Sequence, residues 1–316
     1  MSGERSRVRR AQVRALAKIN LDLRVLGKRP DGYHELRTIF QTISLADTLD
    51  IAFTPEGKTS IELDDALGIP GNLAERAARL VMETLHATGR VEMRLAKRIP
   101  MGAGLGGGSS NAAAVLLALP VLAGRRADLA TLCDMGQQLG SDVPFFLLGG
   151  TAAGIGRGSE LFPLPDSPAR PGLLVTPEVH VSTADAYRQL SARLAADSQQ
   201  DKIFEFQSQA WGAGSGSGAN DFEAVVFEQH PELAALKKRL LRTGATVAMM
   251  TGSGSALFGL YRDAKEVVRA AGLLGDAKTF RITLVSRARY RAMWWRALEP
   301  YIDGRVWPPR SKYGPA

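Results

Sequence analysis

The sequence is short of the residue types that build covalent or metal-bound frameworks. Among 316 residues it has one cysteine, Cys133, and four histidines, at positions 34, 86, 180 and 230, with no spacing typical of metal ligands. A single cysteine excludes an internal disulfide and favours a reducing cytoplasm as the setting. No apolar run reaches the ~20 residues that span a bilayer, and residues 1–10 lack the apolar core of a secretory signal. We therefore expect a cytoplasmic protein with no membrane partner.

Positive charge is concentrated at the two ends of the chain. The net charge is +8, but residues 1–14 carry five arginines against one glutamate, and residues 281–316 carry eight basic residues against two acidic ones. The ends therefore sum to +10 and residues 15–280 to −2. A nucleic-acid-binding face normally lies on the folded body, and basic ends are typically solvated. We expect no nucleic-acid partner, and the oligomeric state stays open.

Hydrophobic periodicity predicts a mixture of helices and short, mostly antiparallel strands. Residues 15–25 alternate apolar and polar side chains, which predicts a strand with one buried face. Residues 38–53 are predicted to form a pair of strands. Asn72 is placed to cap a helix that Gly89 ends. The pattern is that of an α+β protein in two parts, with a boundary near 155–165.

The densest glycine run is GAGLGGGSSN at residues 102–111, between a strand predicted over residues 91–100 and an alanine-rich helix. So much bare backbone is destabilising unless a turn or a ligand requires it. Helix N-termini expose unsatisfied N–H groups and a partial positive charge, and neighbouring glycines let phosphate oxygens approach them. The run therefore predicts a phosphate cradle at the start of a serine-capped helix.

Two other phosphate motifs fit the run less well. GAGLGG at residues 102–107 satisfies G-x-G-x-x-G, the fingerprint of NAD-binding folds, but residues 120–130 show two arginines and no second strand. A Walker loop needs a lysine before its serine, and none precedes Ser109. From the residues alone, an NAD-dependent oxidoreductase and a glycine loop without a ligand both stay open.

Residues 100–113, PMGAGLGGGSSNAA, resemble the phosphate-binding motif of the GHMP kinases, and residues 251–260, TGSGSALFGL, resemble the glycine-rich C-terminal motif of that family. Residues 17–47 and 140–147 are similar to one member in particular. The resemblance covers the chain except for the first ~14 and last ~30 residues. It implies an ATP-dependent kinase of a small molecule, with the two-domain GHMP architecture and its active site in the cleft between the domains.

The same resemblance implies domain limits and an ATP site. The implied parts are a basic extension at 1–14, an N-terminal ATP-binding domain at 15–160, a C-terminal substrate-binding domain at 161–285 and a basic tail at 286–316. The implied cofactors are ATP as co-substrate and Mg²⁺, which Ser109 or Ser110 is expected to reach, although no acidic magnesium ligand stands out in the motifs. The residues implied to bind ATP are Asn72, Lys97, Pro100, Met101, Gly102, Ala103, Gly104, Leu105, Gly106, Gly107, Gly108, Ser109 and Ser110.

Two interpretations compete for Asp142. The local sequence favours a helix N-cap, because Asp142 precedes Val143-Pro144. The resemblance instead implies that Asp142 is the catalytic base for the acceptor hydroxyl. Lys18, which on a polar strand face is typically solvated, is then implied to keep this carboxylate charged and to neutralise the transferred phosphoryl group. The predicted catalytic residues are Lys18 and Asp142.

The acceptor of the resembled member carries a cytidine diphosphate group, and the resemblance implies where its base lies. Tyr33 and His34 are expected to lie against the cytosine ring, with Tyr187 as the opposing ring. Asn20, on the same strand face as Lys18, is expected to orient the acceptor hydroxyl. The residues implied to bind this small-molecule substrate are Asn20, Tyr33, His34, Asp142, Thr183 and Tyr187.

Overall fold

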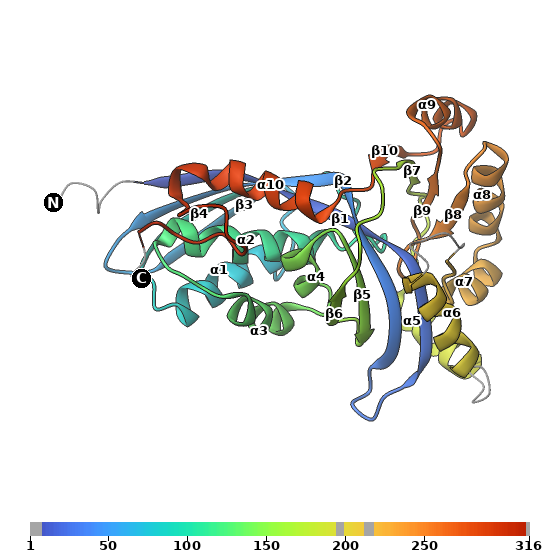
Figure 1. Ribbon diagram of the computed structural model, residues 1–316, viewed down its shortest axis with the longest axis horizontal. Coiled ribbons are helices and arrows are strands. Elements are labelled where there is room, and N and C mark those ends of the chain that lie inside the picture. The colour runs from blue at the N-terminus through green and yellow to red at the C-terminus, as the bar shows by residue number, and fades with distance from the viewer. Residues whose placement is uncertain (1–7, 194–198, 212–217, 314–316) are drawn as a thin grey trace.

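The computed structural model describes residues 8–193, 199–211 and 218–313, whose ten strands form two sheets (Figure 1). The N-terminal sheet contains β1 (Arg9–Lys28), β2 (His34–Pro55), β3 (Ser60–Asp65), β4 (Gly89–Ala96), β5 (Thr151–Gly156) and β6 (Glu160–Pro163). The C-terminal sheet contains β7 (Pro171–Val175), β8 (Val247–Met250), β9 (Leu257–Leu260) and β10 (Thr279–Thr283). Paired strands are antiparallel except β3 and β4. The predicted α+β class is confirmed.

The helices fall into two sets along the chain. The first set is α1 (Leu73–Thr84), α2 (Gly107–Ala123), α3 (Leu129–Leu139) and α4 (Val143–Leu148). The second set is α5 (Thr183–Arg193), α6 (Gln199–Trp211), α7 (Phe222–Gln229), α8 (Pro231–Arg242) and α9 (Ala264–Leu273). Of this second set, α8 and α9 pack on the C-terminal sheet, whereas α6 packs on β1 and β2 (Figure 1). Within the described ranges, no helix combines the length and hydrophobicity that crossing a membrane requires.

The predicted start of α1 is confirmed, but its predicted end is not. The Asn72 side chain caps α1 by accepting a hydrogen bond from the Ala74 N–H at 3.0 Å. The helix ends at Thr84, before the predicted Gly89, because His86 adopts a positive φ of 47° and Gly89 already begins β4. The strand pair predicted over residues 38–53 is wrong.

These residues belong to one continuous strand, β2, because its edge opposite β1 is shared by two shorter strands. β5 pairs with residues 36–41 and β4 with residues 48–55. No turn is needed between the two segments. The long hairpin of β1 and β2 therefore runs through both halves of the molecule.

β1 is buried on both faces, whereas its alternating pattern predicted one solvated face. Lys18, Asn20, Asp22 and Arg24 are all at most 9 % exposed. The cover comes from distant segments: the backbone of Leu23 pairs with Ala219 and Asn220, far along the chain. The predicted polar face of this strand is therefore an interior surface between the two halves.

The two halves share an apolar cluster. Ala17 and Ile19 of β1 meet Met249 and Phe258 of the C-terminal sheet, all at most 1 % exposed. The first sheet ends at Pro163 and the second begins at Pro171. The domain limit expected between 160 and 161 thus falls within β6, and the expected extension 1–14 overlaps β1.

Residues beyond the C-terminal sheet fold back onto the N-terminal domain. Helix α10 (Arg287–Leu298) and the short 3-10 helix η2 (Glu299–Tyr301) lie along it, away from α5–α9 (Figure 1). Tyr290, Trp294 and Leu298 on one face of α10 are at most 2 % exposed and belong to the N-terminal core. The segment expected to be a solvated basic tail therefore packs through its aromatic residues, while its arginines account for the charge.

Candidate active site

Two cavities meet at the glycine loop, residues 102–108. One, of about 440 Å³, lies within the N-terminal domain beside α1 and the start of α2. The other, of about 850 Å³, lies between the domains and is lined by parts of β1, β2 and α5. Gly104 and Gly106 line both cavities. A phosphate chain lying along the loop would therefore reach from the first cavity into the second.

The glycine loop adopts a conformation that favours glycine. Gly102, Gly104 and Gly106 have φ values of 67°, 75° and 68°, in the left-handed region. At Gly104 a Cβ atom would lie 2.2 Å from the carbonyl oxygen of Thr251, in the C-terminal domain. The glycines therefore serve the close approach of two loops as well as an open cavity.

Helix α2 begins at Gly107 without the predicted serine cap. Its N-cap residue, Gly106, has no side chain to accept a hydrogen bond. Ser110 is buried and donates to the carbonyl oxygen of Leu16 at 2.7 Å, whereas Ser109 lines the first cavity. Of the two serines expected near Mg²⁺, Ser109 faces the cavity and Ser110 does not.

Asn72 and Lys97 line the first cavity with polar groups that already have protein partners. The Asn72 amide accepts from Ala74 and donates to Asp65 at 2.9 Å. The Lys97 ammonium lies 2.5 Å from the buried carboxylate of Asp47. Each side chain is therefore held in place before any nucleotide arrives. The remaining predicted ATP-binding residues, from Pro100 to Ser109, line the same cavity.

The predicted catalytic pair lies where the cavities join. The Lys18 ammonium is 3.7 Å from the Asp142 carboxylate. Burial lowers the pKa of Lys18 below its usual value, while the negative charge of Asp142 acts in the opposite direction. Asp142 occupies the N-cap position of α4, yet its side chain caps no backbone N–H. The local interpretation as a capping side chain is thus wrong, and the carboxylate lines the larger cavity beside Lys18.

Asn20 ties the catalytic strand to the second glycine turn. Its Oδ1 accepts from the Lys18 ammonium at 2.8 Å and from the Gly252 N–H at 3.0 Å, and its Nδ2 donates to Thr38 at 2.7 Å. β1 changes register between Leu16 and Lys18 and again after Asn20. Such irregularities re-aim side chains and are common beside active sites. The second N–H of the Asn20 amide group can still donate a hydrogen bond to a ligand.

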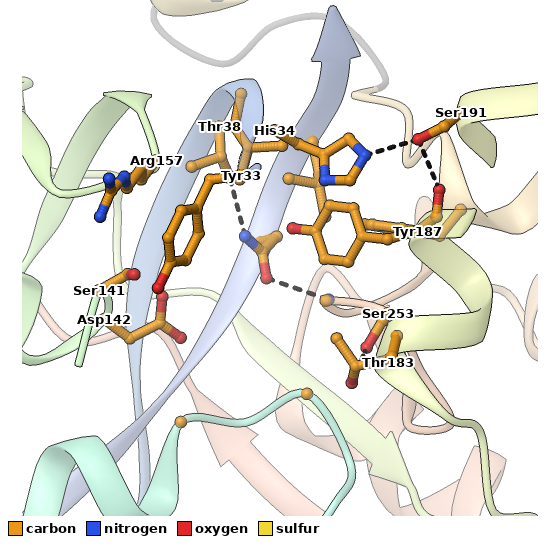
Figure 2. A pocket seen from close by; sticks show the side chains of 18 of the residues that line it. Tyr33, His34, Thr38, Ser141, Asp142, Arg157, Thr183, Tyr187, Ser191 and Ser253 are labelled. Carbon is orange, nitrogen blue, oxygen red and sulfur yellow. Dashed lines mark hydrogen bonds between the residues drawn. The ribbon is translucent and has the colours of Figure 1, made fainter. Parts of the chain in front are cut away.

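Aromatic rings stand on opposite sides of the larger cavity, with Tyr33 on the side of Asp142 and His34 with Tyr187 across from it (Figure 2). The His34 and Tyr187 rings are stacked on each other, with centroids 4.5 Å apart. Tyr33 is 53 % exposed, and the guanidinium of Arg157 lies 3.9 Å from its ring centroid. His34 and Tyr187 therefore form one wall together, so a flat ligand would lie between this wall and Tyr33.

Further residues of the larger cavity were not among the predicted site residues, although one of them contacts the predicted Thr183. The hydroxyls of Thr183 and Ser253 are 2.8 Å apart and join α5 to the second glycine turn. Ser253 lies in the glycine-rich motif 251–260, a signal that could have identified it. Thr38 and Arg157 also line the cavity, but no local pattern distinguishes them from ordinary strand and turn residues.

A glycine loop at a helix N-terminus, opening onto a lysine–aspartate pair between two α+β domains, defines a small-molecule phosphotransferase. The family model of the GHMP kinases N terminal domain matches residues 72–150, and that of the GHMP kinases C terminal matches residues 204–275. The chain belongs to the GHMP kinase family, whose members transfer a phosphoryl group from ATP. Residues after 275 lie outside both matched ranges.

Relatives within this family point to one specificity. The chain is 67 % identical over 315 residues to the 4-diphosphocytidyl-2-C-methyl-D-erythritol kinase of Solibacter usitatus, which covers 98 % of this chain and 100 % of that protein. A crystal structure of 4-(cytidine 5'-diphospho)-2C-methyl-D-erythritol kinase is 38 % identical with a TM-score of 0.73, covering 86 % of this chain and 98 % of that one. The homoserine kinase of Cytophaga hutchinsonii shares the fold at 17 % identity, with a TM-score of 0.66 and coverage of 90 % and 96 %.

Proposed function

We propose that the chain transfers the γ-phosphoryl group of ATP to the 2-hydroxyl of 4-diphosphocytidyl-2-C-methyl-D-erythritol, giving the 2-phosphate and ADP, a step of non-mevalonate isoprenoid biosynthesis. The relatives that carry this name support the acceptor. The observation that carries the chemistry is the position of Lys18 and Asp142 at the junction of two cavities that share a glycine loop.

In the proposed step, the acceptor oxygen forms a bond to the γ-phosphorus as the bond to the bridging oxygen of ADP breaks. Asp142 takes the proton of the acceptor hydroxyl. Lys18 lies beside it and neutralises charge on the transferred group, while the N-terminus of α2 faces the phosphates. The chain thus supplies mainly position and charge, as phosphoryl transfer requires.

Mg²⁺ is proposed to enter with the nucleotide. Across the described residues, no three His, Cys, Asp or Glu side chains come together as a metal site. Ser109 offers one hydroxyl in the ATP cavity. This set fits a magnesium ion held largely by phosphate oxygens and water, the usual mode for Mg²⁺ with nucleotides. When bound, the ion would offset negative charge on the phosphates.

The cytosine ring is proposed to lie between Tyr33 and the wall formed by His34 and Tyr187. Ser191 donates its hydroxyl hydrogen to the Tyr187 carbonyl at 2.8 Å, so its oxygen accepts from His34 Nε2 at 2.5 Å. The proton of neutral His34 is thereby assigned to Nε2, which leaves Nδ1 as an acceptor. Nδ1 is suited to the exocyclic amino group of cytosine.

The alternatives from the sequence gain no support. The glycine loop follows β4 in a mostly antiparallel sheet, whereas an NAD fingerprint follows the first strand of a parallel sheet. The C-terminal segment packs against the N-terminal domain through its aromatic residues, and none of its basic residues lines either cavity. The remaining alternative is that the chain is a GHMP kinase with another substrate, and the test below distinguishes the two.

The test is ADP release by the purified full chain with ATP and Mg²⁺ across a panel of acceptors. The panel contains the cytidylyl methylerythritol, free methylerythritol, homoserine, mevalonate and galactose. We expect turnover with the cytidylyl compound alone at micromolar concentration. Faster turnover of any acceptor without a cytidylyl group would overturn the proposed substrate and leave only the kinase family.

A further inference from the structure

Helix α4 is too short to hold itself in place. It has six residues and starts directly after Asp142. Isolated helices of this length are unstable in water, and the last four carbonyl groups of any helix lack partners within it. One of them, Phe145, is met by the Gly149 N–H at 2.8 Å. The other carbonyls need donors from elsewhere in the chain.

Tyr290 of α10 supplies the first of these donors. Its hydroxyl donates to the Phe146 carbonyl at 2.5 Å. Burial raises the pKa of Tyr290, so the hydroxyl keeps the proton that it donates. At Gly149, a Cβ atom would lie 2.3 Å from the Tyr290 ring. The end of α4 is therefore packed directly against this tyrosine.

Two further donors come from the rest of the segment 287–313, here called the C-terminal strap. The indole N–H of Trp307 donates to the Leu147 carbonyl at 3.0 Å, and Arg287 Nε donates to the Gly149 carbonyl at 3.2 Å. The Trp307 and Tyr290 rings are 6.1 Å apart in an edge-to-face arrangement. The strap thus supplies donors to three backbone carbonyls, those of Phe146, Leu147 and Gly149, at the end of the helix that starts after Asp142.

The opposite side of α4 faces the site. A Cβ atom at Gly106 would lie 2.8 Å from the Phe146 ring, so this ring packs directly beneath the glycine loop. Phe145 packs against Phe40 with ring centroids 4.9 Å apart, and Phe40 lines the larger cavity. A displacement of α4 would therefore move Asp142 relative to the glycine loop and to Lys18.

We propose that the C-terminal strap positions Asp142 for phosphoryl transfer, with Tyr290 and Trp307 as positioning residues that act through the backbone of α4. The inference rests on the proposed role of Asp142 as the base. It assigns a role in catalysis to residues beyond both family-model matches, the second of which ends at residue 275. A misplacement of about 1 Å can cost on the order of 100-fold in rate, so a small shift of α4 is enough to be measured.

The test compares Tyr290→Phe and Trp307→Phe with a matched control, Tyr301→Phe. Tyr301 belongs to the same strap, but its hydroxyl accepts from the backbone N–H of Arg10, at the start of β1. We expect kcat to fall about tenfold in each of the first two variants, while KM for ATP and for the acceptor stay within about twofold. We expect kcat of the control to be unchanged. Hydrogen–deuterium exchange of residues 141–149 should accelerate in the first two variants alone.

Equal kcat in Tyr290→Phe and Tyr301→Phe, or unchanged exchange over residues 141–149, would show that the strap only adds stability and would overturn the proposal. The exchange measurement needs no substrate. If the wild-type chain released no ADP with the cytidylyl acceptor, the proposed function would fail on its own. Exchange would then still decide whether Tyr290 holds α4.

Discussion

Lys18 and Asp142 lie 3.7 Å apart but differ sharply in their access to solvent. The lysine side chain is 5 % exposed and the aspartate side chain 34 %. The lysine is fixed by Asn20, while the carboxylate opens onto the larger cavity. This asymmetry suits a pair in which one member stays in place and the other meets a changing ligand.

Asp142→Asn should lower kcat by about 100-fold or more, the usual scale for loss of a general base. Stability should change little, because the Asp142 side chain caps no helix N–H. The matched control is Asp128→Ala, since Asp128 does cap α3 by accepting from the Thr131 N–H at 2.8 Å. That variant should unfold at a lower denaturant concentration and keep its kcat. Turnover and denaturant unfolding of both variants separate the roles, and normal kcat in Asp142→Asn would exclude it as the base.

Tyr33→Ala should raise KM for the cytidylyl acceptor about 5- to 150-fold, because stacking of a base on an aromatic ring contributes ~1–3 kcal/mol. KM for ATP should stay unchanged. Tyr33 is 53 % exposed, so little folding energy depends on it. Phe162→Ala is the control: Phe162 is 54 % exposed and lies on β6, outside the lining of the larger cavity. A similar KM effect in both variants would contradict the proposed position of the cytosine.

Gly108→Ala should raise KM for ATP without lowering the melting temperature. Gly108 lines the ATP cavity at the start of α2, and its Cβ would make only ordinary contact, 3.5 Å from Leu73. Alanine also has a better helix propensity than glycine. Gly104→Ala should instead lower the melting temperature, because its Cβ would lie 2.2 Å from the Thr251 carbonyl oxygen. Unchanged ATP kinetics in Gly108→Ala would argue against phosphate contact at this point of the loop.

KM for the acceptor should rise as pH falls below His34's depressed pKa. Burial, and then the charge of Lys28, hold the pKa of His34 below 6.5. The ring is therefore neutral at pH 7, and binding that needs Nδ1 as an acceptor is complete above this pKa and lost as pH falls through it. The nearby Asp31–Arg157 pair does not titrate in this window, since Arg157 lowers the pKa of Asp31 to about 2.

The measurement is KM for the acceptor from pH 5 to 8. His34→Gln should remove the rise at acid pH along with much of the affinity. His180→Gln, at an exposed histidine, should keep it. An acid rise that persists in His34→Gln would assign the titration to another group.

The parts of the site that sequence reasoning could find depend on local signals. The Asn72 cap, the glycine loop at the start of α2 and the strand–glycine–strand unit around Thr251 each follow from residues close together in the chain. These three features are set by backbone conformation and helix polarity, so the residues next to each one in the sequence are enough to predict it. The sequence could not show that Ser109, and not Ser110, faces the ATP cavity. That difference depends on the hydrogen bond from Ser110 to Leu16 of a distant strand.

The parts that could not be found depend on contacts between distant segments. The glycine- and serine-rich stretch 210–220 has the composition of a flexible connection. Its residues 212–217 lie outside the described ranges, but Asn220 is 4 % exposed and donates to the carbonyls of Met250 and Gly252. The C-terminal strap likewise showed only its charge in the sequence. Its apolar face can be recognised as part of the core only when the N-terminal domain is folded beside it.

The neighbours of β1 are spread along almost the whole chain, and this sets an order of events during synthesis. Lys18 pairs with the backbone of Leu105, Leu23 with that of Ala219, and Arg10 with the hydroxyl of Tyr301. The contacts of β1 are therefore complete only after residue 301, about 270 residues beyond the end of this strand, has been synthesised. At about 5–20 residues per second, this takes on the order of 15 to 60 seconds. A nascent chain therefore carries its glycine loop, Lys18 and Asp142 well before the strand that bears Lys18 is fully packed.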